Sequence, residues 1–365
     1  MRRIQRLTSM VGAASLVLGT MAVSVATTSA VSASTSFKAC AVLDTGGVND
    51  KSFNQGAWEG MKAAKSAMPG ITIKYLTSTS STDYTPNVNI FMKQGCGLII
   101  TVGFNMDAAT VKASNANLKQ KFAIIDDAPV TKSKNVLGIQ FATDQSGFLG
   151  GMLAAGLTKT GTVATYGGQP FPGVTLYENG FVAGVRYWDK MSKAKVKVLG
   201  WTPGKGACSV NACNGKGTMV GNFTDQTAGK TLATSDFAAG ADIIFPVAGS
   251  VGLGSLAAAK QAGKGKYIMW VDSDACKTDP TNCKYYVGTV TKGVKSSVQA
   301  TVLAAAKGTF KGGSYLGTLA NMGTTLTYGG VMVPASLKAK IATAQAGIIA
   351  GKISVNPNSY PATPK

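Results

Sequence analysis

The chain has 365 residues, of which 45% are hydrophobic and 14% charged, which suggests two or three domains with folded cores and excludes a globally disordered protein. The formal net charge is +20, but the lysines are scattered without a long run, which favours a solvated basic surface over a nucleic-acid groove. No histidine occurs, which excludes Ser-His-Asp and Cys-His triads and imidazole metal sites.

The first 33 residues have the parts of a secretory signal peptide. Three arginines lie among the first six residues, an apolar stretch spans residues 11–26, and small residues lead to Ala33, with Ala30 as the alternative cleavage position. The apolar stretch is shorter than the ~20 residues of a spanning helix, so a leader is favoured over a membrane anchor. Its removal would leave a net charge of +17, because it carries three arginines and no acidic residue. We therefore expect an exported, extracellular or surface-associated protein.

Short apolar runs alternate with amphipathic stretches through the rest of the chain. The expected strands are residues 39–43, 71–76, 97–102, 122–125, 162–166, 196–199, 242–245, 267–271 and 285–289. The expected helices are residues 53–67, 106–118, 147–157, 224–239, 251–262 and 293–307. This alternation predicts an α/β fold with doubly wound, mainly parallel sheets.

Six cysteines in an exported chain indicate disulfides. Two pairs are close in sequence and lie among turn-forming residues, so each is expected to close a surface loop. A four-cysteine zinc site is the alternative, but its usual Cys-x-x-Cys spacing is absent. The expected disulfides are Cys40–Cys96, Cys208–Cys213 and Cys276–Cys283.

The fold also brings Cys40 and Cys96 together. Cys40 opens the first expected strand and Cys96 stands just before the third. These two strands are parallel neighbours in doubly wound sheets, so both cysteines lie toward the amino edge of the sheet. Their offsets from the strand ends differ, so one cysteine must lie in the loop that enters its strand.

In such sheets the ligand binds beyond the carboxyl ends of the strands. Polar or glycine-rich segments follow several of the expected strands. These segments are residues 44–47 and 49–54 after the first strand, then 103–105, 126–127, 248–250 and 272–274. We therefore expect them to form the binding site.

These segments resemble the basic membrane protein family, whose best-understood members are purine nucleoside receptors. Motifs in the family order run through nearly the whole chain after the leader. They are Asp-Thr-Gly-Gly at 44–47, Asp-x-Ser-Phe-Asn at 50–54, Phe-Ala-Ile-Ile-Asp at 122–126, Phe-Leu-Gly-Gly at 148–151, a Gly-Phe-x-Ala-Gly turn at 180–184, Ala-Asp-Ile-Ile-Phe leading to Ala-Gly at 241–249, Val-Asp-x-Asp at 271–274, and Lys292.

The resemblance implies a type I periplasmic-binding-protein fold, in which two doubly wound α/β lobes are joined by three crossings of the chain. We expect the crossings near Asp144, Asp274 and Lys307. The first lobe would comprise residues 34–144 and 274–307, and the second residues 145–273 and 308–365.

The resemblance also implies how a purine base would be held. Phe53 and Phe223 would stack on its two faces, although Phe223 is equally suited to core packing. Asp44 and Asn54 would bind the base edge, although an aspartate after a strand also caps turns. Asp126 follows a strand and would point into the cleft.

Asp272 and Lys292 would hold the ribose, because its two vicinal hydroxyls donate to a carboxylate and its oxygens accept from an ammonium. A structural ion pair between the lobes is the alternative for these two residues. Gly249 would let the backbone approach the ligand closely.

These expectations describe a solute-binding protein that captures guanosine, inosine or adenosine and delivers it to the permease subunits of an ABC importer. It would act as a monomer, without a cofactor, a nucleic-acid partner or an enzymatic activity. Sugar-binding proteins share this architecture, so a sugar or another small solute is the alternative ligand. A secreted nucleoside hydrolase is a weaker alternative, because no motif supplies a nucleophile with an oriented base. Many family members are lipoproteins, but the first cysteine, Cys40, does not lie in a lipobox.

Overall fold

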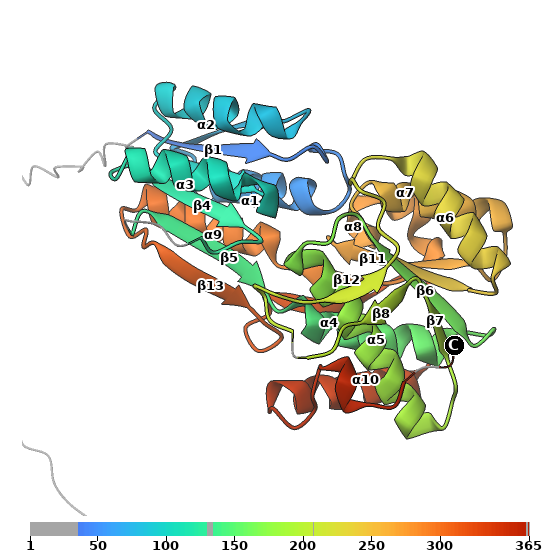
Figure 1. Ribbon diagram of the computed structural model, residues 1–365. Coiled ribbons are helices and arrows are strands. Elements are labelled where there is room, and N and C mark those ends of the chain that lie inside the picture. The colour runs from blue at the N-terminus through green and yellow to red at the C-terminus, as the bar shows by residue number, and fades with distance from the viewer. Residues whose placement is uncertain (1–35, 130–133, 207, 363, 365) are drawn as a thin grey trace, which may run out of the picture. The chain divides into compact units, whose positions relative to one another are not determined.

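The computed structural model describes residues 36–129, 134–206, 208–362 and 364, so the expected signal peptide lies outside the described residues. Two six-stranded sheets organise this part of the chain, and helices pack on both faces of each sheet (Figure 1). We call each sheet with its helices a lobe. The expected fold class, a two-lobed α/β periplasmic-binding-protein fold, is confirmed.

The first lobe is built on a fully parallel sheet with the strand order β13-β5-β4-β3-β1-β2. Along β1, Ala39, Ala41 and Leu43 pack toward α1 and α9, whereas Cys40 and Val42 pack toward α2 and α3. This two-sided burial explains why the strand is apolar throughout. The elements are β1 (Phe37–Leu43), β2 (Ile71–Thr77), β3 (Leu98–Val102), β4 (Lys121–Ile125), β5 (Val136–Phe141), β13 (Gly313–Gly317), α1 (Phe53–Ala67), α2 (Tyr84–Lys93), α3 (Asp107–Ala116) and α9 (Val294–Ala306).

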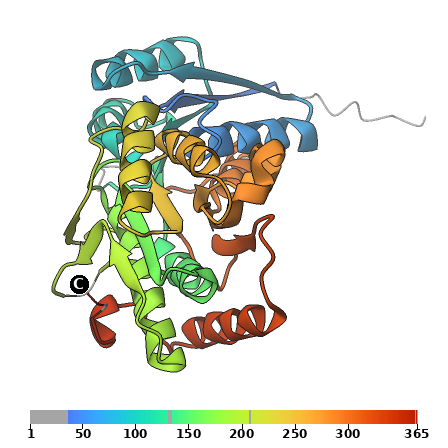
Figure 2. The same cartoon turned by 90° about the vertical axis from the view of Figure 1, so that its right-hand side faces the viewer.

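The second lobe has the strand order β14-β12-β11-β10-β6-β7, parallel except for the edge strand β14. Helices α4, α5 and α10 cover one face and α6 and α7 the other, as the colours in Figure 2 also show. The elements are β6 (Thr162–Gly167), β7 (Lys197–Leu199), β10 (Ile243–Val247), β11 (Tyr267–Asp272), β12 (Tyr286–Lys292), β14 (Thr324–Tyr328), α4 (Thr143–Leu157), α5 (Pro172–Ser192), α6 (Gln226–Ala238), α7 (Val251–Ala262) and α10 (Ala335–Ile349), with the short helix α8 (Ala275–Thr278) and the hairpin β8 (Trp201–Pro203) and β9 (Gly215–Gly217).

The chain passes between the lobes three times, and two of the crossings differ from the expected positions. The first follows β5, close to Asp144 as expected. The second lies at Gly293, not near Asp274, because β12 pairs with β11 and β14 in the second sheet. The third follows β13, not Lys307, because β13 pairs with β5 in the first sheet. An apolar run such as β12 fits either sheet, so the sequence pattern alone did not assign it.

The Gly-Phe-x-Ala-Gly segment, residues 180–184, also differs from its expected structure. The resemblance to the family implied a turn there, but the segment lies within α5. Its glycines serve close helix packing instead, because a Cβ atom at Gly184 would overlap the carbonyl oxygen of Phe148 in α4, and one at Gly151 in α4 would overlap that of Phe181. Glycine is therefore required by the α4–α5 contact and not by a bend in the chain.

All six cysteines form the three expected disulfides. The Cα atoms of Cys40 and Cys96 are 6.0 Å apart, and β1 and β3 are parallel neighbours. Cys96 lies in the loop before β3, as the expected offset required. Within the described parts of the chain, no helix has the length and apolar character needed to cross a membrane.

Candidate ligand-binding site

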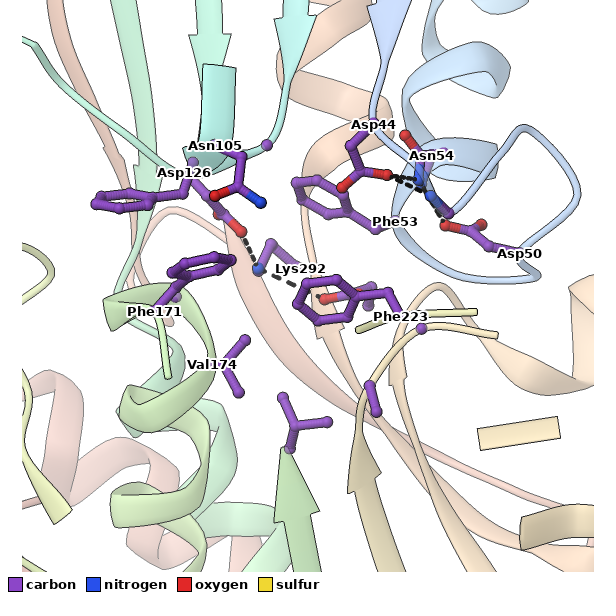
Figure 3. Close-up of a pocket in the computed structure, with 18 of the residues that line it drawn as sticks. Asp44, Asp50, Phe53, Asn54, Asn105, Asp126, Phe171, Val174, Phe223 and Lys292 are labelled. Atoms are coloured by element: carbon purple, nitrogen blue, oxygen red, sulfur yellow. Dashed lines mark hydrogen bonds and ion pairs between the residues drawn. The ribbon is translucent and has the colours of Figure 1, made fainter. Parts of the chain in front are cut away.

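A cavity lies where the carboxyl ends of strands from both sheets meet (Figure 3). Eight residues were expected at the site from the sequence, and all of them line this cavity. They are Asp44, Phe53, Asn54, Asp126, Phe223, Gly249, Asp272 and Lys292. The segments that the strand-end rule selected therefore come together.

The loop after β1 builds one end of the cavity. The Oδ1 atom of Asp44 accepts hydrogen bonds from the Gly46 N–H at 2.9 Å and the Asn54 side-chain amide at 2.7 Å. Asp50 accepts from the backbone N–H groups of Ser52, Asn54 and Gln55 and so caps α1. Burial raises the pKa of Asp44, and it raises that of Asp50 to about 6 against the effect of these donors. Asp44 is thus a partly buried, oriented acceptor at the cavity wall.

Lys292 at the end of β12 joins carboxylates from both lobes. Its Nζ atom lies 2.7 Å from Asp126 Oδ2 of the first lobe and 3.6 Å from Asp272 Oδ1 of the second. Burial by itself would lower the pKa of Lys292, but the two carboxylates outweigh it and the pKa is raised, so the ammonium stays charged. Asp272 and Lys292 both face the cavity, but they lie on neighbouring strands of the second sheet, so the expected ion pair between lobes is formed by Lys292 with Asp126 and not with Asp272.

The two carboxylates share an unusual backbone conformation. Asp126 directly follows β4 with a φ of 69°, and Asp272 ends β11 with a φ of 63°, which places both in the left-handed region. Non-glycine residues occupy this region at a cost that the surrounding contacts must offset. The conformation turns each side chain from its strand end into the cavity, where both reach Lys292.

Aromatic rings form much of the remaining wall. Phe53 begins α1 in the first lobe, while Phe223 lies in the loop before α6 in the second. The Phe171 ring lies 6.3 Å from Phe223 and 5.2 Å from Phe104, measured between centroids. Gly249 has a φ of 55°, and a Cβ atom there would lie 3.6 Å from Phe223. Flat apolar surfaces from both lobes therefore face one cavity (Figure 3).

Sequence reasoning did not select Phe171 and Tyr177, which also line the cavity. Phe171 lies between Pro170 and Pro172, in a glycine- and proline-rich segment directly after β6. The strand-end rule, applied to that expected strand, would have found Phe171. Tyr177 lies inside a helix that was not expected, so the pattern offered no comparable signal.

Comparison with known families identifies the chain. The family model described as ABC transporter substrate-binding protein PnrA-like, named Bmp, matches residues 37–207 and 216–323. The chain belongs to this family. An ABC transporter nucleoside-binding protein, BmpA, of Lactococcus lactis is 32% identical over 88% of this chain and 89% of its own length. Basic membrane protein A of Borreliella afzelii is 30% identical over 76% and 78% of the two chains.

Solved structures agree with the fold. An ABC transporter solute-binding protein from Aeropyrum pernix superposes with a TM-score of 0.75 at 22% identity, covering 87% of this chain and 92% of that one. As a Bmp-family member, the protein is an ABC transporter substrate-binding protein and not an enzyme. The family acts in the extracellular or periplasmic space or at the cell surface.

Proposed function

We propose that this Bmp-family protein captures a purine nucleoside, namely guanosine, inosine or adenosine, between its lobes and delivers it as a monomer to an ABC importer. The observation that carries this proposal is the combination of phenylalanine rings from both lobes with carboxylates at two separate places on the cavity wall. The similarity to the nucleoside-binding protein of Lactococcus lactis supports the same ligand class.

The base would lie between Phe53 and Phe223. Every purine presents two apolar faces, and stacking a base on an aromatic side chain is worth about 1–3 kcal/mol. Asp44 would then accept from ring N–H or amino groups at the base edge, since its carboxylate lies at the cavity wall and is held by Gly46 and Asn54. Asp126 would face the cleft as the acidic partner of Lys292.

The ribose would lie near Asp272 and Lys292. Asp272 can accept from both vicinal hydroxyls, and Lys292 can donate to the ribose oxygens while it offsets the charge of the carboxylate. Gly249 would allow the backbone to approach the ligand where its φ of 55° disfavours other residues. Sugars also suit carboxylates and aromatic rings, so the decisive comparison is between a whole nucleoside and its parts.

Isothermal titration calorimetry with the purified protein tests the ligand class. Guanosine, inosine or adenosine is expected to bind more tightly than ribose or the free base, because only the nucleoside occupies both the aromatic and the acidic parts of the cavity. Native mass spectrometry of freshly purified protein would identify a ligand carried from the cell. Tight sugar binding with no heat from any purine nucleoside would reject the proposal in favour of a sugar-binding function.

Replacing Phe53 with alanine is expected to weaken nucleoside binding by roughly 1–3 kcal/mol, about 5- to 150-fold, because a stacking surface is lost. The unfolding temperature without ligand should change little, since Phe53 is only partly buried at the first turn of α1. Unchanged affinity with a large fall in the unfolding temperature would assign Phe53 to core packing alone.

Residues 1–33 are proposed to act as a signal peptide that directs export. Expression in a bacterial host with intact secretion should yield a mature protein that begins at Ser34, or at Val31 if cleavage follows Ala30. Mass measurement of the secreted protein decides between these positions. Full-length protein confined to the cytoplasm would refute the export proposal.

A further inference from the structure

Ser52 stands at the N-cap of α1 but does not cap it. Serine at this position usually accepts a hydrogen bond from the N–H of the second or third helical residue. Here the Ser52 side chain makes no capping bond, and Asp50 accepts from the backbone N–H groups of Asn54 and Gln55 instead. Ser52 is nevertheless fully buried, so its hydroxyl must be satisfied elsewhere.

The Ser52 hydroxyl reaches the second lobe. Its Oγ atom lies 2.8 Å from Asp272 Oδ2 and 3.3 Å from the carbonyl oxygen of Val271. The other carboxylate oxygen, Asp272 Oδ1, accepts from the Tyr177 hydroxyl at 3.2 Å and faces Lys292 at 3.6 Å. Asp272 is therefore held at both oxygens, by a first-lobe group at one of them and by second-lobe groups at the other.

The loop that carries Ser52 is fastened to the second lobe by further bonds. The carbonyl oxygen of Lys51 accepts from Trp270 Nε1 at 3.2 Å and from Thr278 Oγ1 at 3.1 Å. The carbonyl oxygen of Ser52 accepts from Ser273 Oγ at 2.7 Å. Lys51 has a φ of 59°, so these bonds also hold a backbone conformation that lysine rarely adopts. Docking of this loop and orientation of Asp272 occur at one junction.

We propose that Ser52 is a positioning residue that orients the Asp272 carboxylate toward the ribose diol and makes diol recognition depend on docking of the first-lobe loop against the second lobe. The inference rests on the proposed nucleoside function and adds how the site would recognise the ribose diol. With Oδ2 held by Ser52 and Oδ1 by Tyr177 and Lys292, the carboxylate plane is set by contacts within the protein once the loop is docked. Binding two hydroxyls then requires little reorientation of the side chain.

The chain offers a matched control for this proposal. Ser273 makes a bond of similar length across the same junction, but its hydroxyl bonds to the Ser52 backbone and not to Asp272. Ser273→Ala therefore removes a docking bond alone, whereas Ser52→Ala removes a docking contact and a donor to Asp272 together. A 2′,3′-dideoxynucleoside supplies the matching ligand control, because it keeps the base and lacks the diol.

Calorimetry should measure how tightly wild type, Ser52→Ala and Ser273→Ala bind two ligands. These are the purine nucleoside that wild type binds and the 2′,3′-dideoxy form of that nucleoside. Ser52→Ala is expected to weaken nucleoside binding about tenfold, the effect of losing a hydrogen bond to a charged group, and to change dideoxynucleoside binding less than about twofold. Ser273→Ala should affect both ligands alike. In an Asp272→Ala background, Ser52→Ala should have no further effect on nucleoside affinity.

Equal losses for the two ligands, or no loss in Ser52→Ala, would overturn the positioning role while leaving nucleoside binding intact. Additive losses in the Asp272→Ala background would overturn it as well. If wild type binds no purine nucleoside, both the proposed function and this inference fail. Should Ser52→Ala not fold, Ser52→Gly is measured against the same two ligands, and the same selective loss is required of it.

Discussion

Replacing Asp272 with alanine is expected to weaken purine nucleoside binding by about 2–5 kcal/mol, roughly 30-fold to several thousandfold. The carboxylate is buried at the cavity wall and is held by Ser52, Tyr177 and Lys292. The ribose diol would donate two hydrogen bonds to this fixed anion, and truncation leaves both hydroxyls without their acceptor. The fold should survive, because Lys292 keeps its 2.7 Å contact with Asp126.

Calorimetry with a 2′,3′-dideoxynucleoside isolates the diol from the rest of the ligand. Wild type should already bind this ligand more weakly, and Asp272→Ala should reduce its affinity by much less than that of the nucleoside. Circular dichroism and the unfolding temperature of the variant serve as controls for its structure. Equal losses for the two ligands would remove Asp272 from the ribose site and leave it a structural ion-pair partner.

Replacing both Cys40 and Cys96 with alanine is expected to lower the free energy of unfolding by around 4 kcal/mol. The two residues are 56 apart in sequence, so their disulfide constrains a long loop of the unfolded chain. The bond connects Cys40, in the middle of β1, to the segment that enters β3, and neither cysteine lines the ligand cavity. Nucleoside affinity measured well below the unfolding temperature should therefore change little.

Removal of the Cys208–Cys213 disulfide is the matched comparison. These cysteines are five apart in sequence, and the same chain-entropy relation assigns their bond about 2 kcal/mol. Urea unfolding of the two double variants should show the larger loss for Cys40 and Cys96. Similar losses in both variants would contradict the entropic explanation, and peptide mapping without reduction that found Cys40 joined to a loop cysteine would contradict the pairing itself.

Local sequence patterns were sufficient to predict many of the strands and helices. The strand expected at 39–43 is β1, and the helix expected at 53–67 is α1 with the same bounds. β1 is a short apolar run buried on both faces, and α1 buries residues at helical spacing, so the pattern and the structure agree for both elements. By contrast, α5 was not expected, because its glycines suggested a turn. The structure shows that they allow α4 and α5 to pack closely.

Most residues of the candidate site could also be predicted from the sequence. A parallel sheet brings the carboxyl ends of its strands to one edge, so polar residues after separate strands must meet wherever the strands pair. This argument selected Asp44, Asp126 and Asp272 without coordinates, and the resemblance to the Bmp family added Phe223 and Lys292. All of them line one cavity.

The sequence by itself determined the α/β class, the three cysteine pairs and the strand ends that form the cavity, because each depends on local composition and on general rules of parallel sheets. Only the tertiary structure decided to which sheet β12 and β13 belong, since their pairing depends on partners distant in sequence. It also decided that the Ser52 hydroxyl donates a hydrogen bond to Asp272, 220 residues away in sequence, and does not cap its own helix. Hydrogen bonds between distant residues are set by how the lobes pack, which no local pattern records.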